Sequence, residues 1–277
     1  MKFDLHIHTK YSDGTDSPNE ILLKAEQLGL EAISITDHDN CNAYHDMDKS
    51  LFSGRIINGI EMQAVCLGQS IELLGYGFGI KNLNKLIDGL YLPFAELNIK
   101  EMELSYDACR AMGMVFDEDV LTRYDKNEFY YATDYLHSEI IKNPFNRKFV
   151  PNDQSRNDAA AFFRKHTSNP QSPFYINENL LLPSYEKVIH IIHKAGGKVF
   201  IPHIFQYGNK SSELLTQLLQ TNKIDGIECY YPSFTTAQTN YLSDICIQNN
   251  LLISGGSDYH GSCRGNEMGL NINVIIK

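Results

Sequence analysis

The sequence lacks the long apolar segment that a membrane-spanning helix needs. Its 277 residues contain no run of about 18 consecutive apolar residues. The first residues, Met1–Asp4, also lack the basic and then apolar pattern of a signal peptide. We therefore expect a cytoplasmic protein that does not bind membranes.

Closely spaced cysteines are missing as well. The six cysteines are scattered and none forms a Cys-x-x-Cys pair, standing at Cys41, Cys66, Cys109, Cys229, Cys246 and Cys263. This spacing fits reduced thiols and argues against a zinc site made of thiolates. Any metal must therefore be held by histidine and carboxylate side chains.

The chain has no excess of basic residues. It carries 24 Lys and Arg against 34 Asp and Glu, a formal net charge of −10. Proteins that bind long nucleic acids through phosphates usually show a basic stripe, so we expect no such partner. Small anionic substrates are compatible with this charge, because bound divalent cations can reverse the sign of the field in one cleft.

The first segment with chemical character is the stretch from Phe3 to Gly14. His6 and His8 alternate along a predicted strand, so both side chains would project to the same side. Asp13 follows in a turn-forming Ser-Asp-Gly sequence and can add an oxygen ligand. Taken alone, such a pair of histidines could also lie by chance on a polar strand face, so the remainder of the chain must decide.

Strand and helix patterns alternate on both sides of a long central segment. A helix capped by Ser17 precedes a strand at 31–36, and strands follow at 55–65 and 70–76. From Ser184 onwards, helices at 185–195, 212–221 and 235–248 alternate with strands at 198–203, 226–231 and 251–256. This alternation predicts an α/β protein with a parallel, barrel-like sheet formed by residues 1–80 and 183–277.

Residues 81–182 have a different character. They show helical periodicity, several prolines and many tyrosines, but no comparable strand alternation. We predict a helical insertion that caps the active site. The alternative is that its aromatic residues (Tyr124, Tyr130, Tyr131 and Tyr135) merely form the insertion's own core.

Histidines and carboxylates gather at the predicted strands. They are His6, His8, Asp13, His38, Glu61, Glu72, His203, Asp258 and His260. A catalytic zinc ion usually takes three protein ligands plus water, so this set is too large for one ion. It suffices for two or three divalent ions that share a bridging carboxylate.

These residues, in this order along the chain, resemble the sequence pattern of the polymerase and histidinol phosphatase (PHP) family. The sequence is most similar to its stand-alone phosphoesterases of nucleoside bisphosphates and oligonucleotide ends. The resemblance implies a distorted (β/α)7 TIM-like barrel with a trinuclear site of manganese, iron or zinc. It further implies one ion held by His6, His8, Glu61 and Asp258, a second by Glu61, His203 and Glu72, and a third by Asp13, His38 and His260.

Three positions depart from the family pattern. Glu72 stands where relatives usually have histidine, and this oxygen ligand would favour Mn²⁺ or Fe²⁺ over Zn²⁺. His203 is not followed by the Pro-Gly-Arg run of the relatives. Asp134 aligns with a substrate-facing histidine. The substrate can therefore differ from that of the close relatives.

The expected reaction is hydrolysis of a phosphomonoester of a small substrate, most simply a nucleotide or nucleoside bisphosphate. A hydroxide bridging the ions would attack phosphorus. Asp258 would be required for turnover, and His203 or Asp134 would protonate the leaving oxygen. Arg264 would clamp the phosphate, unless it is a solvated loop residue.

Three other functions remain open at this level. The first is a histidinol-phosphate or sugar-phosphate phosphatase. The second is a metal-dependent amidohydrolase, although no predicted strand ends in the bridging lysine typical of that class. The third is a non-catalytic binding module, which the complete set of donors argues against. The sequence pattern does not indicate which oligomeric state the protein adopts.

Overall fold

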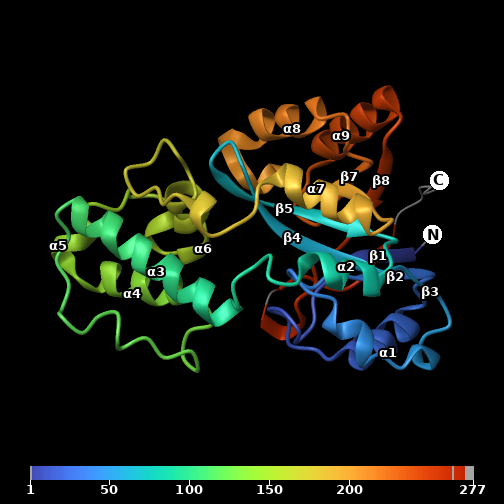
Figure 1. Ribbon diagram of the computed structural model, residues 1–277, viewed down its shortest axis with the longest axis horizontal. Helices are drawn as coiled ribbons and strands as arrows, with labels where there is room; N and C mark the ends of the chain where they lie inside the picture. The colour runs from blue at the N-terminus through green and yellow to red at the C-terminus, as the bar shows by residue number, and fades with distance from the viewer. Residues whose placement is uncertain (1, 264, 272–277) are drawn as a thin grey trace. The chain divides into compact units, whose positions relative to one another are not determined.

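The computed structural model describes residues 2–263 and 265–271 (Figure 1). The chain forms two compact units. The first, here called the sheet unit, comprises residues 1–64, 71–88 and 184–277, and the second, the helical unit, comprises residues 65–70 and 89–183. No helix of the described ranges has both the length and the apolar character needed to cross a membrane.

One sheet of the sheet unit carries the start of the chain. Its strand order is β3-β2-β1-β9, with bounds β1 (Lys2–Ile7), β2 (Ala32–Ile35), β3 (Arg55–Ile56) and β9 (Leu270–Asn271). β1 and β2 are parallel and are connected by α1 (Pro18–Leu28). The predicted capping box is present, because the Ser17 hydroxyl accepts a hydrogen bond from the Glu20 backbone N–H and the Glu20 carboxylate accepts one from the Ser17 backbone N–H.

The other sheet carries the remaining strands. Its order is β4-β5-β6-β7-β8, with bounds β4 (Gly59–Cys66), β5 (Gln69–Tyr76), β6 (Lys198–Ile201), β7 (Gly226–Tyr230) and β8 (Leu252–Gly255). β6, β7 and β8 are parallel, as predicted, but β5 is antiparallel to β6. The reason is the two-residue connection from β4 to β5, in which Leu67 and Gly68 both have positive φ, because so short a turn can only join antiparallel strands.

A second correction concerns the strand predicted over 55–65. The structure divides it into β3, which pairs with β2, and β4, which begins the other sheet. Two single parallel bridges join the sheets, one between Ile7 and Tyr259 and one between His38 and Glu61. The α/β class is confirmed, whereas the described strands form two sheets and not one continuous barrel.

Helices cover the sheets of this unit. They are α2 (Ile80–Ile87), α7 (Tyr185–Lys194), α8 (Ser211–Gln220) and α9 (Thr236–Asn249), with 3-10 turns at Asn42–His45, Lys49–Leu51, Ile204–Lys210 and Gly261–Cys263. Phe3 and Leu5 of β1 pack against Leu74 and Phe200 of the other sheet. Burial of such a side chain contributes about 1.5–3 kcal/mol, so this core holds β1 and its histidines in register.

The helical unit has its own core. Its helices are α3 (Phe94–Ala111), α4 (Ala132–Lys142), α5 (Pro144–Arg147) and α6 (Ala159–Phe162), followed by a π-helical turn at Phe163–Thr167 and 3-10 turns at Gln154–Arg156 and Glu178–Leu180. Tyr135 is buried in this core together with Met102 and Phe174. Tyr130 is 46% exposed. The predicted aromatic set therefore divides between core and surface.

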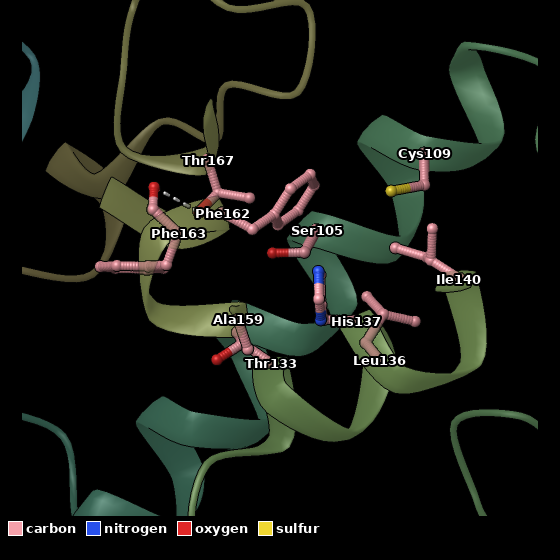
Figure 2. A pocket seen from close by; sticks show the side chains of 10 residues that line it. All are labelled: Ser105, Cys109, Thr133, Leu136, His137, Ile140, Ala159, Phe162, Phe163 and Thr167. Atoms are coloured by element: carbon pink, nitrogen blue, oxygen red, sulfur yellow. Dashed lines mark hydrogen bonds between the residues drawn. The ribbon is translucent and has the colours of Figure 1, made fainter. Parts of the chain in front are cut away.

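A small cavity lies inside the helical unit between α3, α4 and α6 (Figure 2). Its volume is about 10 Å³, and Ser105, His137 and Phe162 are among the side chains that line it. The buried Ser105 hydroxyl has no hydrogen-bond partner. A space of this size holds about one water molecule, so the cavity cannot be a substrate site.

Candidate metal centre

The predicted ligand residues come from both sheets of the sheet unit. His6 lies in β1 and His8 directly follows it, while His38, His203 and Asp258 follow β2, β6 and β8. Parallel strands present their carboxyl ends at one edge, which explains this convergence. Glu61 and Glu72 instead lie inside β4 and β5, which form a hairpin and therefore run in opposite directions.

The structure brings these donors together in three overlapping groups whose atoms lie within 4.8 Å of one another. They are His6, His8, Glu61 and Asp258; His8, Asp13, His38 and His260; and His38, Glu61 and Glu72. His203 Nε2 adds to the last group, at 2.9 Å from Glu61 Oε1 and 3.4 Å from Glu72 Oε2. Glu61 is shared by two groups, as a bridging carboxylate would be.

Burial gives this cluster strong internal electrostatics. His6, His8 and Glu61 are at most 1% exposed. Burial alone would lower the pKa of His8, but hydrogen bonds to Asp258 and Glu61 raise it to about 10. Burial would likewise raise the pKa of Glu61, yet His6 and the other imidazoles hold it well below its usual range. The carboxylates thus raise the pKa of His6, His8 and His203, whereas burial lowers that of His260.

The donor set fits divalent cations. His6 Nε2 and His8 Nε2 lie 3.1 Å apart, an arrangement in which two lone pairs repel unless a proton or a cation lies between them. The buried Nδ1 atom of His38 has no hydrogen-bond partner and lies 3.5 Å from Glu61 Oε2. Imidazole nitrogens combined with carboxylate oxygens suit manganese, iron and zinc.

Comparison with known proteins agrees with this geometry. Residues 4–231 match the family model described as PHP domain. The chain belongs to the PHP domain family. It is accordingly a metal-dependent phosphoesterase, a hydrolase.

Curated relatives of this PHP protein carry several activities. A 5′-3′ exoribonuclease of Haemophilus influenzae is 25% identical over 99% of this chain and 95% of the relative. A phosphoribosyl 1,2-cyclic phosphate 1,2-diphosphodiesterase of Eggerthella lenta is 23% identical over 93% of this chain and 94% of the relative. A 3′,5′-nucleoside bisphosphate phosphatase of Chromobacterium violaceum is 23% identical over 95% of this chain and 88% of the relative.

Two solved structures share the fold. One, described as a metal-dependent phosphoesterase from Bifidobacterium adolescentis, has a TM-score of 0.62 and 23% identity and covers 96% of this chain and 90% of its own. The other is described as an amidohydrolase from Chromobacterium violaceum with bound sulfate and no metal. It has a TM-score of 0.68 and 20% identity, and the match covers 98% of this chain and 91% of the other chain. At this identity the likeness concerns the fold alone.

Glu228, which contacts the candidate metal centre, was missed by the sequence argument. This side chain on β7 is fully buried, and its Oε1 lies 3.0 Å from His6 Nδ1. Its Oε2 accepts the backbone N–H of His203 at 2.7 Å. The available signal was a carboxylate flanked by Ile227 and Cys229 in an apolar strand, where an unpaired charge would be costly.

Two further buried carboxylates hold the loops of the candidate metal centre. Asp4 accepts hydrogen bonds from the Ser257 N–H and hydroxyl, and burial raises its pKa to about 6. Asp37 accepts the Thr9 N–H at 2.6 Å and the Ser12 hydroxyl at 2.8 Å. They thereby hold the segments that carry Asp258 and Asp13.

Two predicted residues are not among the three donor groups. Asp134 belongs to α4 of the helical unit, where burial, with the charge of Asp158, raises its pKa. Its role as a proton donor stays a prediction, as does the capping role of that unit. Arg264, the predicted phosphate clamp, lies outside the described residues.

Proposed function

We propose that this protein hydrolyses a phosphomonoester of a small substrate, a nucleotide or nucleoside bisphosphate, at a centre of two or three divalent ions. The observation that carries the proposal is the set of three donor groups that overlap at His8, His38 and Glu61. Overlap of this kind suits several ions a short distance apart. Phosphoryl transfer needs such concentrated positive charge around the reacting phosphate.

We propose that the sheet unit, which contains the centre, folds as a distorted barrel of seven strands. The order β4 to β8 within one sheet, the pairing of β1 with β2, and the two single bridges between the sheets support this proposal. The bridges join Ile7 to Tyr259 and His38 to Glu61, where the two sheets would close into the barrel.

The proposed ligand roles follow the donor groups. One ion would be held by His6, His8, Glu61 and Asp258, a second by Glu61, His203 and Glu72, and a third by Asp13, His38 and His260. When bound, such ions lower the pKa of water and offset the charge of the phosphoryl oxygens. The carboxylate of Glu72 favours manganese or iron in the second position.

The chain's own residues orient the reacting groups. The Tyr231 hydroxyl donates to Asp258 Oδ2 at 2.9 Å and holds that carboxylate in place. His203 directs Nε2 towards Glu61 and Glu72, while its buried Nδ1 has no hydrogen-bond partner. His203 and Asp134 are our candidates for the group that protonates the leaving oxygen.

Aromatic side chains beside the centre support a substrate with a planar ring. The rings of Tyr231 and His203 have centroids 5.6 Å apart. Phe234 lies 5.2 Å from Tyr231 and 5.1 Å from Phe205. Tyr241, which is 51% exposed, continues this cluster beside Phe205. Such rings can stack a nucleobase, which favours a nucleotide over a sugar phosphate.

Phosphate release tests the proposal. The metal-loaded protein would be offered a nucleoside 3′,5′-bisphosphate, a sugar phosphate, histidinol phosphate, a cyclic phosphodiester and a 5′-phosphorylated RNA. We expect the highest kcat/KM with the bisphosphate. Faster cleavage of the diester or RNA would contradict the phosphomonoester assignment, and cleavage of none of these substrates would count against the proposed function.

A further inference from the structure

Glu228 connects two parts of the centre that come from different strands. Its side chain is fully buried in β7, with one oxygen directed to His6 of β1 and the other to the backbone of His203 after β6. The distances are 3.0 Å to His6 Nδ1 and 2.7 Å to the His203 nitrogen. A single rigid carboxylate thus contacts one residue from each of two proposed ion sites.

The chemistry of this contact determines which His6 nitrogen faces the ions. A carboxylate only accepts hydrogen bonds, so His6 Nδ1 must carry the hydrogen that lies between it and Glu228. In the neutral ring, the lone pair is then on Nε2. That atom lies 3.2 Å from Glu61 Oε2 and 3.4 Å from Asp258 Oδ1, inside the first donor group.

We propose that Glu228 is a positioning residue, which fixes the tautomer of His6 and sets its spacing from His203. The inference rests on the proposed ligand roles of these two histidines. Carboxylates behind ligating histidines act in this way generally, and their loss typically weakens metal binding about 10- to 100-fold.

Glu228→Gln tests the idea because it preserves shape but not acceptor character. If the amide oxygen keeps the His203 N–H, the NH₂ group faces His6 Nδ1 and forces the hydrogen onto Nε2, where it blocks a metal. If the amide is turned, its NH₂ group meets the His203 N–H and leaves two donors opposed. Neither orientation satisfies both partners.

Asp225→Asn is the matched control. Asp225 also faces an imidazole, at 2.7 Å from His193 Nε2, and also accepts a backbone N–H, that of Val199 at 2.8 Å. It belongs to none of the three donor groups. Glu228→Asp provides the conservative rescue, because it keeps two acceptor oxygens on a shorter side chain.

The experiment measures Zn²⁺ affinity by chelator competition and the histidine ring nitrogens by ¹⁵N NMR of the zinc-loaded protein. We expect Glu228→Gln to bind zinc about 10- to 100-fold more weakly, Glu228→Asp to recover part of that loss, and Asp225→Asn to match the wild type. Unchanged affinity in Glu228→Gln, or an equal loss in Asp225→Asn, would overturn the proposal.

The ¹⁵N NMR spectrum of the zinc-loaded wild type tests the proposed tautomer of His6 even if Glu228→Gln does not fold. His6 should show a hydrogen on Nδ1 and a coordinated Nε2, and the reverse pattern would overturn the inference. A wild type that shows the expected pattern but releases no phosphate from any substrate would count against the proposed function alone. The two failures are therefore distinguishable.

Discussion

Single side chains in the centre are constrained by both charge and backbone geometry. Asp258 has φ 54°, a left-handed conformation that Asp and Asn tolerate better than most residues. Its pKa is held well below the usual range, because His6 and His8 outweigh the effect of burial. The residue therefore needs both its charge and its conformation.

Replacement of Asp258 by Asn separates these two requirements. We expect the fold to persist, because Asn tolerates the same φ, and phosphate release to fall at least about 100-fold, because an ion loses a charged ligand. Asp39→Asn is the control, since Asp39 has φ 56° and lies outside the donor groups. Wild-type turnover and metal content in Asp258→Asn would contradict the proposed site.

His137 gives the helical unit a dependence on pH. Burial lowers its pKa, and its Nε2 lies 2.8 Å from the Ser155 carbonyl oxygen. As pH falls below about 6.5, the unfolded chain takes up the proton first, so stability is lost on acidification. We expect a smaller loss between pH 7 and pH 5 in His137→Gln, measured by urea unfolding. Identical losses in both proteins would refute this assignment.

At the scale of elements, caps and turns determine where strands and helices begin. Ser17→Ala removes the acceptor for the Glu20 backbone at the start of α1 and should cost about 1 kcal/mol of unfolding free energy. Ser17→Asn keeps an acceptor and should stay close to the wild type. Urea unfolding of both variants measures this, and equal stability of Ser17→Ala and the wild type would show that the cap contributes nothing.

β8 and β1 approach so closely that a glycine is needed between them. A Cβ atom on Gly256 would lie 2.1 Å from His6 Cβ and 2.5 Å from the His6 nitrogen. Gly256→Ala should therefore cost about 1–3 kcal/mol and weaken zinc binding by displacing His6. Gly265→Ala, where a Cβ meets open space, is the control. The measurements are urea unfolding and zinc competition, and equal behaviour of both variants would contradict the close packing.

The sequence was informative where local spacing carries the signal. The alternation of His6 and His8, the Ser17 cap and the strands β6, β7 and β8 follow from periodicity and end signals. The division of residues 55–65 into β3 and β4 follows from their partners in space, which no local pattern records. The same holds for Glu228, because a carboxylate within a strand looks alike whether it faces water or a buried histidine.

At the scale of the whole molecule, metal binding should stabilise the two units unequally. All three donor groups belong to the sheet unit. A ligand at about 100 times its Kd adds about 2.7 kcal/mol, so chelation should lower the Tm of that unit by about 5 to 10 °C. Hydrogen exchange should show faster opening in residues 1–64 and little change in residues 89–183. Equal effects in both ranges would contradict a centre confined to the sheet unit.

The sheet unit is discontinuous along the chain, and this sets an order of events during synthesis. The donors extend from His6 to His260, and Asp4 accepts the backbone N–H of Gly269. Domains generally fold from the N-terminal side as the ribosome proceeds, and residues 89–183 are all made before Asp258 emerges. The nascent chain can therefore build its helical unit before the proposed ligands Asp258 and His260 have been made. If the proposed ligand roles hold, translation of β8 and the loop after it would be the step that completes the metal centre.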